Sequence, residues 1–452
     1  MRSAQANFDQ AESHYSWAVA QKTSVEKQVE EYAGAIQTLS NELAQLTNQY
    51  ATFASTHSGA LVDGAFFSKS HSERQTTPPW LDAETAKLRG YLFEAAIALH
   101  KAFIDGAAKQ IRHNCSIFLE NYGAKSLGSP EKDSLIADLW TTFFLVVPVV
   151  STTFASVGNM LSGLGQEELG WMLIDEAGQA LPQAAVGALL RSKRAVVVGD
   201  PLQIEPIVVL PEGLTEKICD NFSVDPNIYN PPGASAQTLA DRSTGYLGSF
   251  ETQYGTREVG VPLLVHRRCA EPMFSISNAV AYENMMVQAK QPKPSSIIEA
   301  VGDSRWLDVS GRAQGKWCPQ EGDVVLQLLR AIRAKGCDPD LYLVTPFVDV
   351  QNGLRALLIS SSILEGWVEN PREWVHERVG TVHTVQGREA EAVIFVLGAP
   401  EASQRGARAW AGKTPNLLNV AVTRAKEAVY VIGAKEAWKD AGVFHSLYSK
   451  LR

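Results

Sequence analysis

The chain has 452 residues, a net charge of −8 and a hydrophobic content of 45%, values that are typical of a soluble globular protein with two or three domains. No apolar stretch reaches the roughly 18 residues that a membrane span needs, and no secretory signal is visible, so we expect no membrane partner. The five cysteines are scattered and odd in number, which argues against a disulfide framework or a zinc knuckle and predicts a cytoplasmic protein with reduced thiols.

The N-terminal 55 residues carry a sustained heptad pattern. Its apolar positions alternate steps of four and three, and they are Val25, Val29, Tyr32, Ile36, Leu39, Leu43, Leu46, Tyr50 and Phe53. This spacing keeps one apolar seam on a helix and favours a coiled coil. A second helical pattern, from about residue 81 to 122, places Leu88, Leu92, Ala95, Leu99 and Phe103 on one face. Two long helices joined by a loop predict an antiparallel hairpin, a stalk over residues 1–130, with self-association through the first helix as the alternative.

From about residue 140, short apolar runs alternate with helical patterns. The runs cover residues 145–150, 171–174, 195–198, 342–344, 392–397 and 429–432. Near-continuous apolar strands separated by helices predict an α/β fold whose parallel sheets are covered on both faces. A polar stretch over 225–260, with Asn-Pro-Pro-Gly at 230–233, predicts a long surface segment between two α/β domains.

Two acidic residues, Asp175 and Glu176, end the apolar run at 171–174 and open the sequence Asp-Glu-Ala-Gly-Gln. Open α/β sheets bind ligands at the carboxyl ends of their strands. In nucleotide hydrolases the first of two such acids holds Mg²⁺ and the second polarises the attacking water. An Asp-Glu pair alone is a weak signal, because strands often end in acids, but the longer sequence is a stronger one.

A second polar turn, Gly-Asp-Pro-Leu-Gln at 199–203, follows the apolar run at 195–198. Gly and Pro set a tight turn that directs Asp200 and Gln203 toward the same crevice. The Gln203 amide can both donate and accept hydrogen bonds, so it can sense a phosphate oxygen or a water molecule.

These segments resemble motifs II and III of superfamily 1 helicases, in the branch of the nonsense-mediated-decay helicase, senataxin and the Dna-type nuclease-helicases. The segments similar to other motifs occur in the family's order at 150–153, 264–269 with 276–278, 344–347 with Gln351, 381–389 and 419–426. One departure is His266-Arg267, where the family more often has Gln-Tyr. The resemblance covers about residues 140–440 and implies two RecA-like domains, over 131–260 and 261–452, with the stalk inserted in the first.

The resemblance also implies a role for each matched residue. It assigns ATP binding to Asp175, Glu176, Gln203, Arg268, Gly387, Glu389 and Arg424, with Asp175 holding Mg²⁺ and with Glu176, Gln203, Arg268 and Arg424 as catalytic residues. It assigns contact with single-stranded DNA or RNA to Ser151, Thr152, Thr345, Pro346, Gln351, Thr381 and His383. Lys413 is a further candidate for a phosphate contact. Arginines that reach across a cleft act only when the cleft is shut, so closure would be tied to hydrolysis.

The sequence contains no phosphate-binding loop of the form G-x-x-x-x-G-K-[ST]. Gly-Lys-Thr at 412–414 imitates its end, but the preceding Gly406 is one residue too far away. We therefore expect an incomplete first motor domain. The chain would be a fragment or one half of a split protein whose missing N-terminal half bears the loop. Alone, it would bind ATP poorly and hydrolyse almost none.

Three functions fit these observations. The first is an ATP-dependent helicase or translocase that moves on single strands. The second is a non-catalytic module that binds nucleic acid or a partner through the stalk and the second motor domain, and the third is a homo-oligomeric scaffold built on the heptad helix. The retained acids and both arginines favour the first. Tryptophans in the second half could stack on bases, with core packing or loop anchoring as the alternative for each: Trp306, Trp317, Trp367, Trp374 and Trp410.

Overall fold

A computed structural model describes residues 2–57, 59–252, 255–291, 293–385 and 387–451. Gln386, part of the motif predicted at 381–389, lies outside the described residues. The chain divides into two compact units, Met1–Leu99 and His100–Arg452. Among the described residues, no helix is long and apolar enough to cross a membrane.

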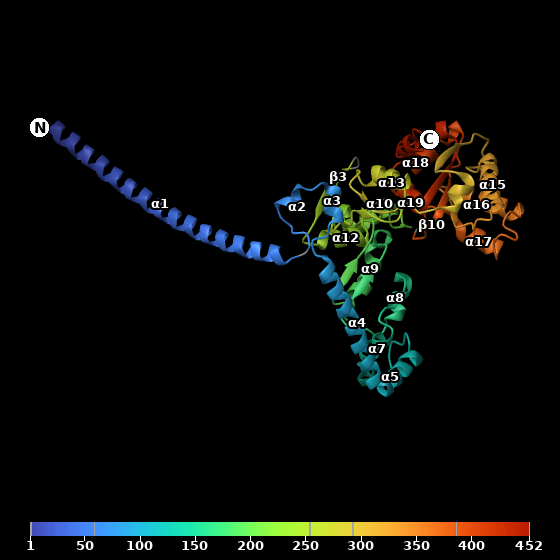
Figure 1. The fold of residues 1–452 in the computed structure, drawn as a ribbon, viewed down its shortest axis with the longest axis horizontal. Coiled ribbons are helices and arrows are strands. Elements are labelled where there is room, and N and C mark those ends of the chain that lie inside the picture. The colour runs from blue at the N-terminus through green and yellow to red at the C-terminus, as the bar shows by residue number, and fades with distance from the viewer. Residues whose placement is uncertain (1, 58, 253–254, 292, 386, 452) are drawn as a thin grey trace. The chain divides into compact units, whose positions relative to one another are not determined.

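The first unit is helical (Figure 1). Its helices are α1 Arg2–Thr56, α2 Gly64–Ser68, α3 His71–Thr76 and the start of α4 Ala83–Gly106. The first long helix predicted from the sequence is present as α1, which contains no proline and a single glycine. The second predicted helical stretch, from about residue 81 to 122, is divided between α4 and α5 Ala108–Glu120. The apolar seams of α1 and α4 do not pack against each other, because Leu39 and Leu43 of α1 and Leu88 and Leu92 of α4 are all exposed. The predicted coiled-coil stalk therefore stays a prediction.

The second unit begins with a small helical core. Its helices are the end of α4, α5 Ala108–Glu120, α6 Pro130–Asp133, α7 Ile136–Val146 and α8 Phe154–Met160. The ring of Phe118 lies 4.8 Å from that of Trp140 and 4.4 Å from that of Phe143, measured between centroids. The strand predicted at 145–150 is wrong, because α7 extends to Val146 and residues 147–150 form no strand. Short apolar runs do not distinguish strand from helix, and here the buried side chains recur at helical spacing.

Two short parallel strands follow. β1 Met172–Ile174 pairs with β2 Ala195–Val197, and α9 Pro182–Leu190 connects them after the 3₁₀ turn Ala177–Gln179. Both strands confirm predicted runs. The prediction that this sheet is covered on both faces is wrong in the structure, since the side chains of Trp171, Leu173, Val196 and Val198 are exposed.

The stretch at 225–260 is more structured than a surface segment. It contains α11 Pro226–Tyr229, α12 Ala236–Ser243 and an antiparallel hairpin of β3 Gly248–Thr252 and β4 Gly255–Val259, and α10 Glu212–Asn221 precedes it. Ser235 caps α12, and one side of this helix is buried through Ala236, Gln237 and Asp241. The prediction failed because two of these buried residues are polar: Asp241 accepts hydrogen bonds from the Gln237 side chain and from a backbone amide.

The C-terminal part is built on a five-stranded parallel sheet in the order β7-β11-β10-β8-β9. Its strands are β7 Arg305–Asp308, β8 Leu341–Thr345, β9 Val379–Thr381, β10 Ala390–Val396 and β11 Ala425–Gly433. β8, β10 and β11 confirm predicted runs, and their apolar side chains are buried. This part also contains the parallel pair β5 Val265–His266 and β6 Val287–Gln288, together with α13 Met273–Ala281, α14 Ser296–Val301, α15 Pro319–Ala334, α16 Val348–Ser360, α17 Pro371–Arg378, the 3₁₀ turn Ala402–Gln404, α18 Arg405–Ala411, α19 Pro415–Thr423, α20 Lys435–Trp438 and α21 Phe444–Lys450.

Candidate nucleotide site

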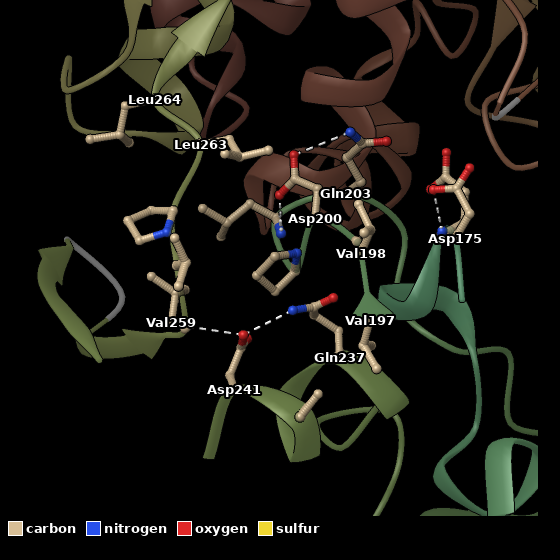
Figure 2. Close-up of a pocket in the computed structure, with 18 of the residues that line it drawn as sticks. Asp175, Val197, Val198, Asp200, Gln203, Gln237, Asp241, Val259, Leu263 and Leu264 are labelled. Atoms are coloured by element: carbon tan, nitrogen blue, oxygen red, sulfur yellow. Dashed lines mark hydrogen bonds between the residues drawn. The ribbon is translucent and has the colours of Figure 1, made fainter. Parts of the chain in front are cut away.

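A cleft of about 1510 Å³ lies at the carboxyl ends of β1 and β2. Figure 2 shows Asp175 at the end of β1, with Asp200 and Gln203 in the loop after β2 and Gln237 and Asp241 on α12. The predicted site residues that line the cleft are Asp175, Glu176, Gln203, Arg268 and Glu389. The structure thus brings together side chains that lie more than 200 positions apart in the sequence.

The acidic pair occupies a tight loop. Glu176 adopts a left-handed conformation, with φ of 52°, which is uncommon for a residue with a side chain. Its backbone N–H donates to Asp175 Oδ1 at 2.9 Å, and its Oε2 accepts from Gln179 Nε2 at 2.9 Å. Non-glycine residues in this region of backbone space concentrate at functional sites.

Two glycines allow the loops after β1 and β2 to touch. A Cβ atom on Gly199 would lie 2.7 Å from the backbone nitrogen of Gly178, and one on Gly178 would lie 2.9 Å from the carbonyl oxygen of Asp200. Both distances are shorter than real Cβ contacts, and the opposing atoms are backbone. Any larger residue at either position would therefore push the two loops apart.

Asp200 is the hydrogen-bond centre of the second loop. Its carboxylate accepts from the Leu202 N–H at 2.9 Å and from Gln203 Nε2 at 3.1 Å. It also accepts from the Tyr282 hydroxyl. Burial, followed by the nearby Asp200 charge, raises the pKa of Tyr282 well above its ordinary value, so the phenol stays a donor. Tyr282 lies just after α13, so this bond links the β2 loop to the C-terminal part.

Asn419 on α19 makes a second link between the same regions. Its side chain is buried, and its Nδ2 donates to the Leu202 carbonyl and to the Tyr282 hydroxyl, each at 2.9 Å. Its Oδ1 accepts from the Ser277 hydroxyl at 2.7 Å. The preceding turn of α19 also contributes, since Asn416 Nδ2 donates to the Gln203 carbonyl. The loop that presents Gln203 is therefore held by α19.

The two predicted arginines differ in their surroundings. Arg268 lies at the cleft wall, where its Nε is 3.1 Å from Glu389 Oε2, and Lys426 Nζ is 2.7 Å from Glu389 Oε1. The hydrogen bond from Lys426 is the main cause that lowers the pKa of Glu389. These contacts hold the Glu389 carboxylate between two cations.

Arg424 is 1% exposed, and burial, followed by the Arg268 charge, lowers its pKa. Its Nη1 donates to the Arg388 carbonyl at 3.1 Å and its Nη2 to Gln203 Oε1 at 3.5 Å. Among the described residues, its Nε has no hydrogen-bond partner. Gly387, predicted to approach the nucleotide sugar, is exposed two residues before Glu389 and has φ of 78°.

The residues predicted to contact a nucleic-acid strand fall into two groups. The exposed ones are Ser151, Thr152, His383 and Lys413, and the buried ones are Thr345, Pro346, Gln351 and Thr381. The structure does not bring all of them to one surface. Thr345 Oγ1 accepts from the Phe347 N–H at 3.3 Å, a bond that shapes the turn after β8.

The sequence predicted no site role for Tyr282 or Asn419. It predicted that Asp200 faces the crevice, but it did not place Asp200 among the residues that bind ATP. Asn419 stands at the start of the segment 419–426, so position offered a signal for it. Tyr282 lies in none of the motifs. It contributes to the site because the fold places its hydroxyl against the Asp200 carboxylate. Arg257 was missed for the same reason: it comes from the stretch interpreted as surface, yet its Nη2 donates to the Pro201 carbonyl at 3.1 Å.

Comparisons with known proteins found similar domains and proteins. Two family models, each described as an AAA domain, match residues 10–210 and 251–436. The chain is similar to the DNA replication ATP-dependent helicase/nuclease DNA2 of Mus musculus, with 23% identity over 320 residues, which are 67% of this chain and 28% of the mouse protein. It is also similar to the uncharacterized ATP-dependent helicase MG140 homolog of Mycoplasma pneumoniae, with 24% identity over 323 residues, 67% of this chain and 26% of that protein. The chain spans about a quarter of the length of these relatives.

Among solved structures, the chain resembles the arterivirus nonstructural protein 10 helicase. The TM-score is 0.28, with 13% identity over 59% of this chain and 39% of that chain. For the complex of that helicase with DNA, the TM-score is 0.30, with 13% identity over 60% of this chain and 42% of that chain. Scores at this level do not establish a shared fold. The chain is thus similar to AAA domains and to ATP-dependent helicases, which agrees with the resemblance of its motifs to superfamily 1 helicases.

Proposed function

We propose that this chain supplies the hydrolytic part of an ATP-dependent helicase or translocase that moves on single-stranded nucleic acid. The observation that carries the proposal is the shared cleft. Asp175, Glu176 and Gln203 reach it from the ends of β1 and β2, and Arg268 and Glu389 reach it from the C-terminal part. Acids at strand ends opposite arginines match the chemistry of phosphoryl transfer to water.

In this proposal, Glu176 orients the attacking water and takes its proton. Its carboxylate already accepts from the Gln179 amide, which fixes the direction of its second oxygen. Gln203, held by Asp200, presents an amide to the same space and can bond to the γ-phosphate or to the water. An isosteric Glu176→Gln change would remove the base and keep the shape.

The residues also fit Mg²⁺, which would neutralise phosphate charge when bound. Among the described residues, no three His, Cys, Asp or Glu side chains are grouped to hold a metal. Mg²⁺ in nucleotide sites is usually held by one or two carboxylates and by the substrate phosphates, so a dedicated cage is not needed. Asp175, exposed at the end of β1, is the carboxylate that we assign to it.

Arg268 and Arg424 would stabilise charge on the phosphates. Arg424 is buried with one guanidinium nitrogen unpaired among the described residues, so it has a donor for an incoming anion. Its bond to Gln203 links the arginine to the β2 loop. Movement of the C-terminal part toward β1 and β2 would therefore move both arginines relative to the acids, which is how closure would be tied to hydrolysis.

The grip on the β- and γ-phosphates would come from a polypeptide segment outside this sequence. Two observations support this part of the proposal: the sequence has no G-x-x-x-x-G-K-[ST], and the side chains of β1 and β2 are partly uncovered. Large exposed apolar patches commonly mark interaction sites. Without the grip, we expect weak ATP binding and almost no hydrolysis.

The test measures two activities of residues 1–452 beside the Glu176→Gln variant: ATP hydrolysis with and without oligo(dT), and anisotropy of fluorescein-labelled oligo(dT). We expect strand binding that weakens with salt and hydrolysis no faster than in the variant. Failure to bind the strand would reject the helicase proposal. Strand-stimulated hydrolysis that Glu176→Gln abolishes would support the nucleotide site. It would also reject the proposal that holding the phosphates requires a further polypeptide segment.

A further inference from the structure

The structure separates the tryptophans of the C-terminal part by exposure. Six tryptophans lie between residues 261 and 452, and all of them are described. Trp306 and Trp438 are buried, and the indole of Trp306 donates to the Gly433 carbonyl. Trp410 is different, because 56% of it is exposed. The others, Trp317, Trp367 and Trp374, are half-buried and pack against the core of the C-terminal part.

The side chain of Trp410 packs against a second aromatic ring, that of Phe347. Its ring centroid lies 6.0 Å from that of Phe347, with 35° between the ring planes. Phe347 is buried, and it also contacts the ring of the buried Trp438 at 6.3 Å. Trp410 is therefore anchored on the core through Phe347 while much of its surface faces solvent. A rigid exposed ring of this kind loses little conformational entropy when a flat partner stacks on it.

A lysine lies beside this ring pair, since Lys316 Nζ is 5.5 Å from the centroid of the Phe347 ring. The exposed Lys413 follows Trp410 by one turn of the chain, where its backbone N–H donates to the Trp410 carbonyl at 3.3 Å. Lys316 Nζ also lies 3.5 Å from Asp349 Oδ2. Both partners of that ion pair are well exposed, so the pair is weak and Lys316 can exchange it for a phosphate.

Two segments predicted to touch a nucleic-acid strand meet at this place. Pro346 precedes Phe347, and Lys413 follows Trp410, although more than 60 residues separate the two segments. We propose that the Trp410 indole is a stacking platform for a base of single-stranded nucleic acid, with Lys316 and Lys413 contacting neighbouring phosphates. The inference rests on the proposed function and adds to it a base-contacting residue. Every base has a stacking face, so this contact would be tolerant of sequence.

A single strand suits this surface better than a protein partner does. An exposed aromatic ring with a lysine nearby complements a base and its phosphate. A protein interface would offer a wider apolar surface around its aromatic anchor. The exposed residues next in the chain to Phe347 and near Trp410 on its own segment are Val348, Arg405 and Lys413, of which two are charged.

The experiment compares the full chain with Trp410→Ala, Trp410→Leu and Trp410→Phe. The probes are fluorescein-labelled oligo(dT) of about 12 nucleotides and an abasic strand of equal length. We expect Ala and Leu to weaken oligo(dT) binding about tenfold and Phe to retain most of it. The abasic strand should bind the wild type and the Ala variant equally, and the salt dependence of oligo(dT) binding should not change, because no charge is removed. Lys413→Ala should reduce the salt slope by about one.

Equal oligo(dT) affinity of wild type and Trp410→Ala would overturn the stacking inference and leave the proposed function standing. Wild type that binds neither strand would overturn both. An equal loss on the abasic strand would also overturn the inference, since the indole would then act on the backbone or on folding. Full affinity in Trp410→Leu would show an apolar contact in place of stacking. A change of sedimentation in Trp410→Ala, with strand binding intact, would indicate a second copy of the chain as the occupant.

Discussion

Two parallel sheets in one unit reach different degrees of burial. In the five-stranded sheet, β10 lies between two neighbouring strands, and Val393, Ile394 and Phe395 are completely buried. In the two-stranded sheet, Leu173 of β1 is 67% exposed and Val196 of β2 is 41% exposed. The strands of the two sheets are alike in sequence, since each of those compared is a short apolar run followed by a loop. The difference shows that burial of such a strand depends on its neighbours as well as on its composition.

The same contrast bears on function. Arg424, which lies directly before β11, is 1% exposed. The end of β1, which presents Asp175 and Glu176, has only a small core of Ile174, Ala177, Ala185 and Ala236. Strand edges and apolar faces left open are costly, and proteins normally pair or cover them. We infer that the acidic side of the cleft depends on an additional segment more than the arginine side does.

The largest effect is expected from a charge placed in each sheet. Val393→Asp would bury a carboxylate in the centre of β10 and destabilise the fold by more than about 4 kcal/mol. Val196→Asp would leave its carboxylate in water and change stability by less than about 1 kcal/mol. Urea unfolding of the two variants beside the wild type measures both. Similar losses in the two variants would contradict the difference in burial.

A pH effect is expected from Glu321, which is buried on α15. Its Oε2 accepts from the Gly398 N–H at 2.8 Å, and burial raises its pKa from 4.5 to about 8. Between these values the folded state binds a proton that the unfolded state has lost, so stability should fall as the pH rises from 4.5 to 8, by an amount on the order of a few kcal/mol. Glu321→Gln keeps the acceptor and removes the titration. A stability profile as steep in this variant as in the wild type would assign the slope to other groups.

A loss of about 2 kcal/mol is expected from Asn419→Ala, because the change leaves the Ser277 hydroxyl and the Leu202 carbonyl without their buried partner. Gln203 should also become less ordered, since its loop is held by α19. Thermal unfolding reports the first effect. Asn352→Ala, on the exposed side of α16, is the matched control and should change stability by less than about 0.5 kcal/mol. An Asn419 variant as stable as this control would show that the hydrogen bonds of Asn419 do not contribute to the stability of the fold.

The smallest stability effect is expected from Glu389→Gln. The carboxylate and its partner Arg268 are both about 40% exposed at the side chain, and exposed ion pairs contribute less than about 1 kcal/mol. Nucleotide affinity should change more than stability, because Arg268 loses the anion that positions it. Thermal unfolding measures the change in stability, and calorimetric titration with Mg·ATP measures the change in nucleotide affinity. A variant that loses stability and keeps full affinity would place the pair in the scaffold and not in the site.

The sequence allowed the strands and the cleft residues to be predicted where local pattern decides the outcome. β8, β10 and β11 were predictable because their apolar runs end in recognisable turns, and Asp175 and Gln203 were predictable because a strand end fixes where its next residues lie. The strand predicted at 145–150 is not formed, because a six-residue apolar run does not distinguish a strand from the end of a helix such as α7. The roles of Tyr282 and Arg257 were not predictable, since they depend on which loops the fold brings together.

The most direct test of the account is Mg·ATP binding to residues 1–452, measured by calorimetry for the wild type, Asp175→Asn and Arg268→Ala. We predict saturable but weak binding to the wild type, with a Kd of about 1 mM. Both variants should bind still more weakly, because their side chains line one cleft from opposite sides. Absence of saturable binding, or equal affinity in all three proteins, would contradict the assignment of this cleft as the nucleotide site.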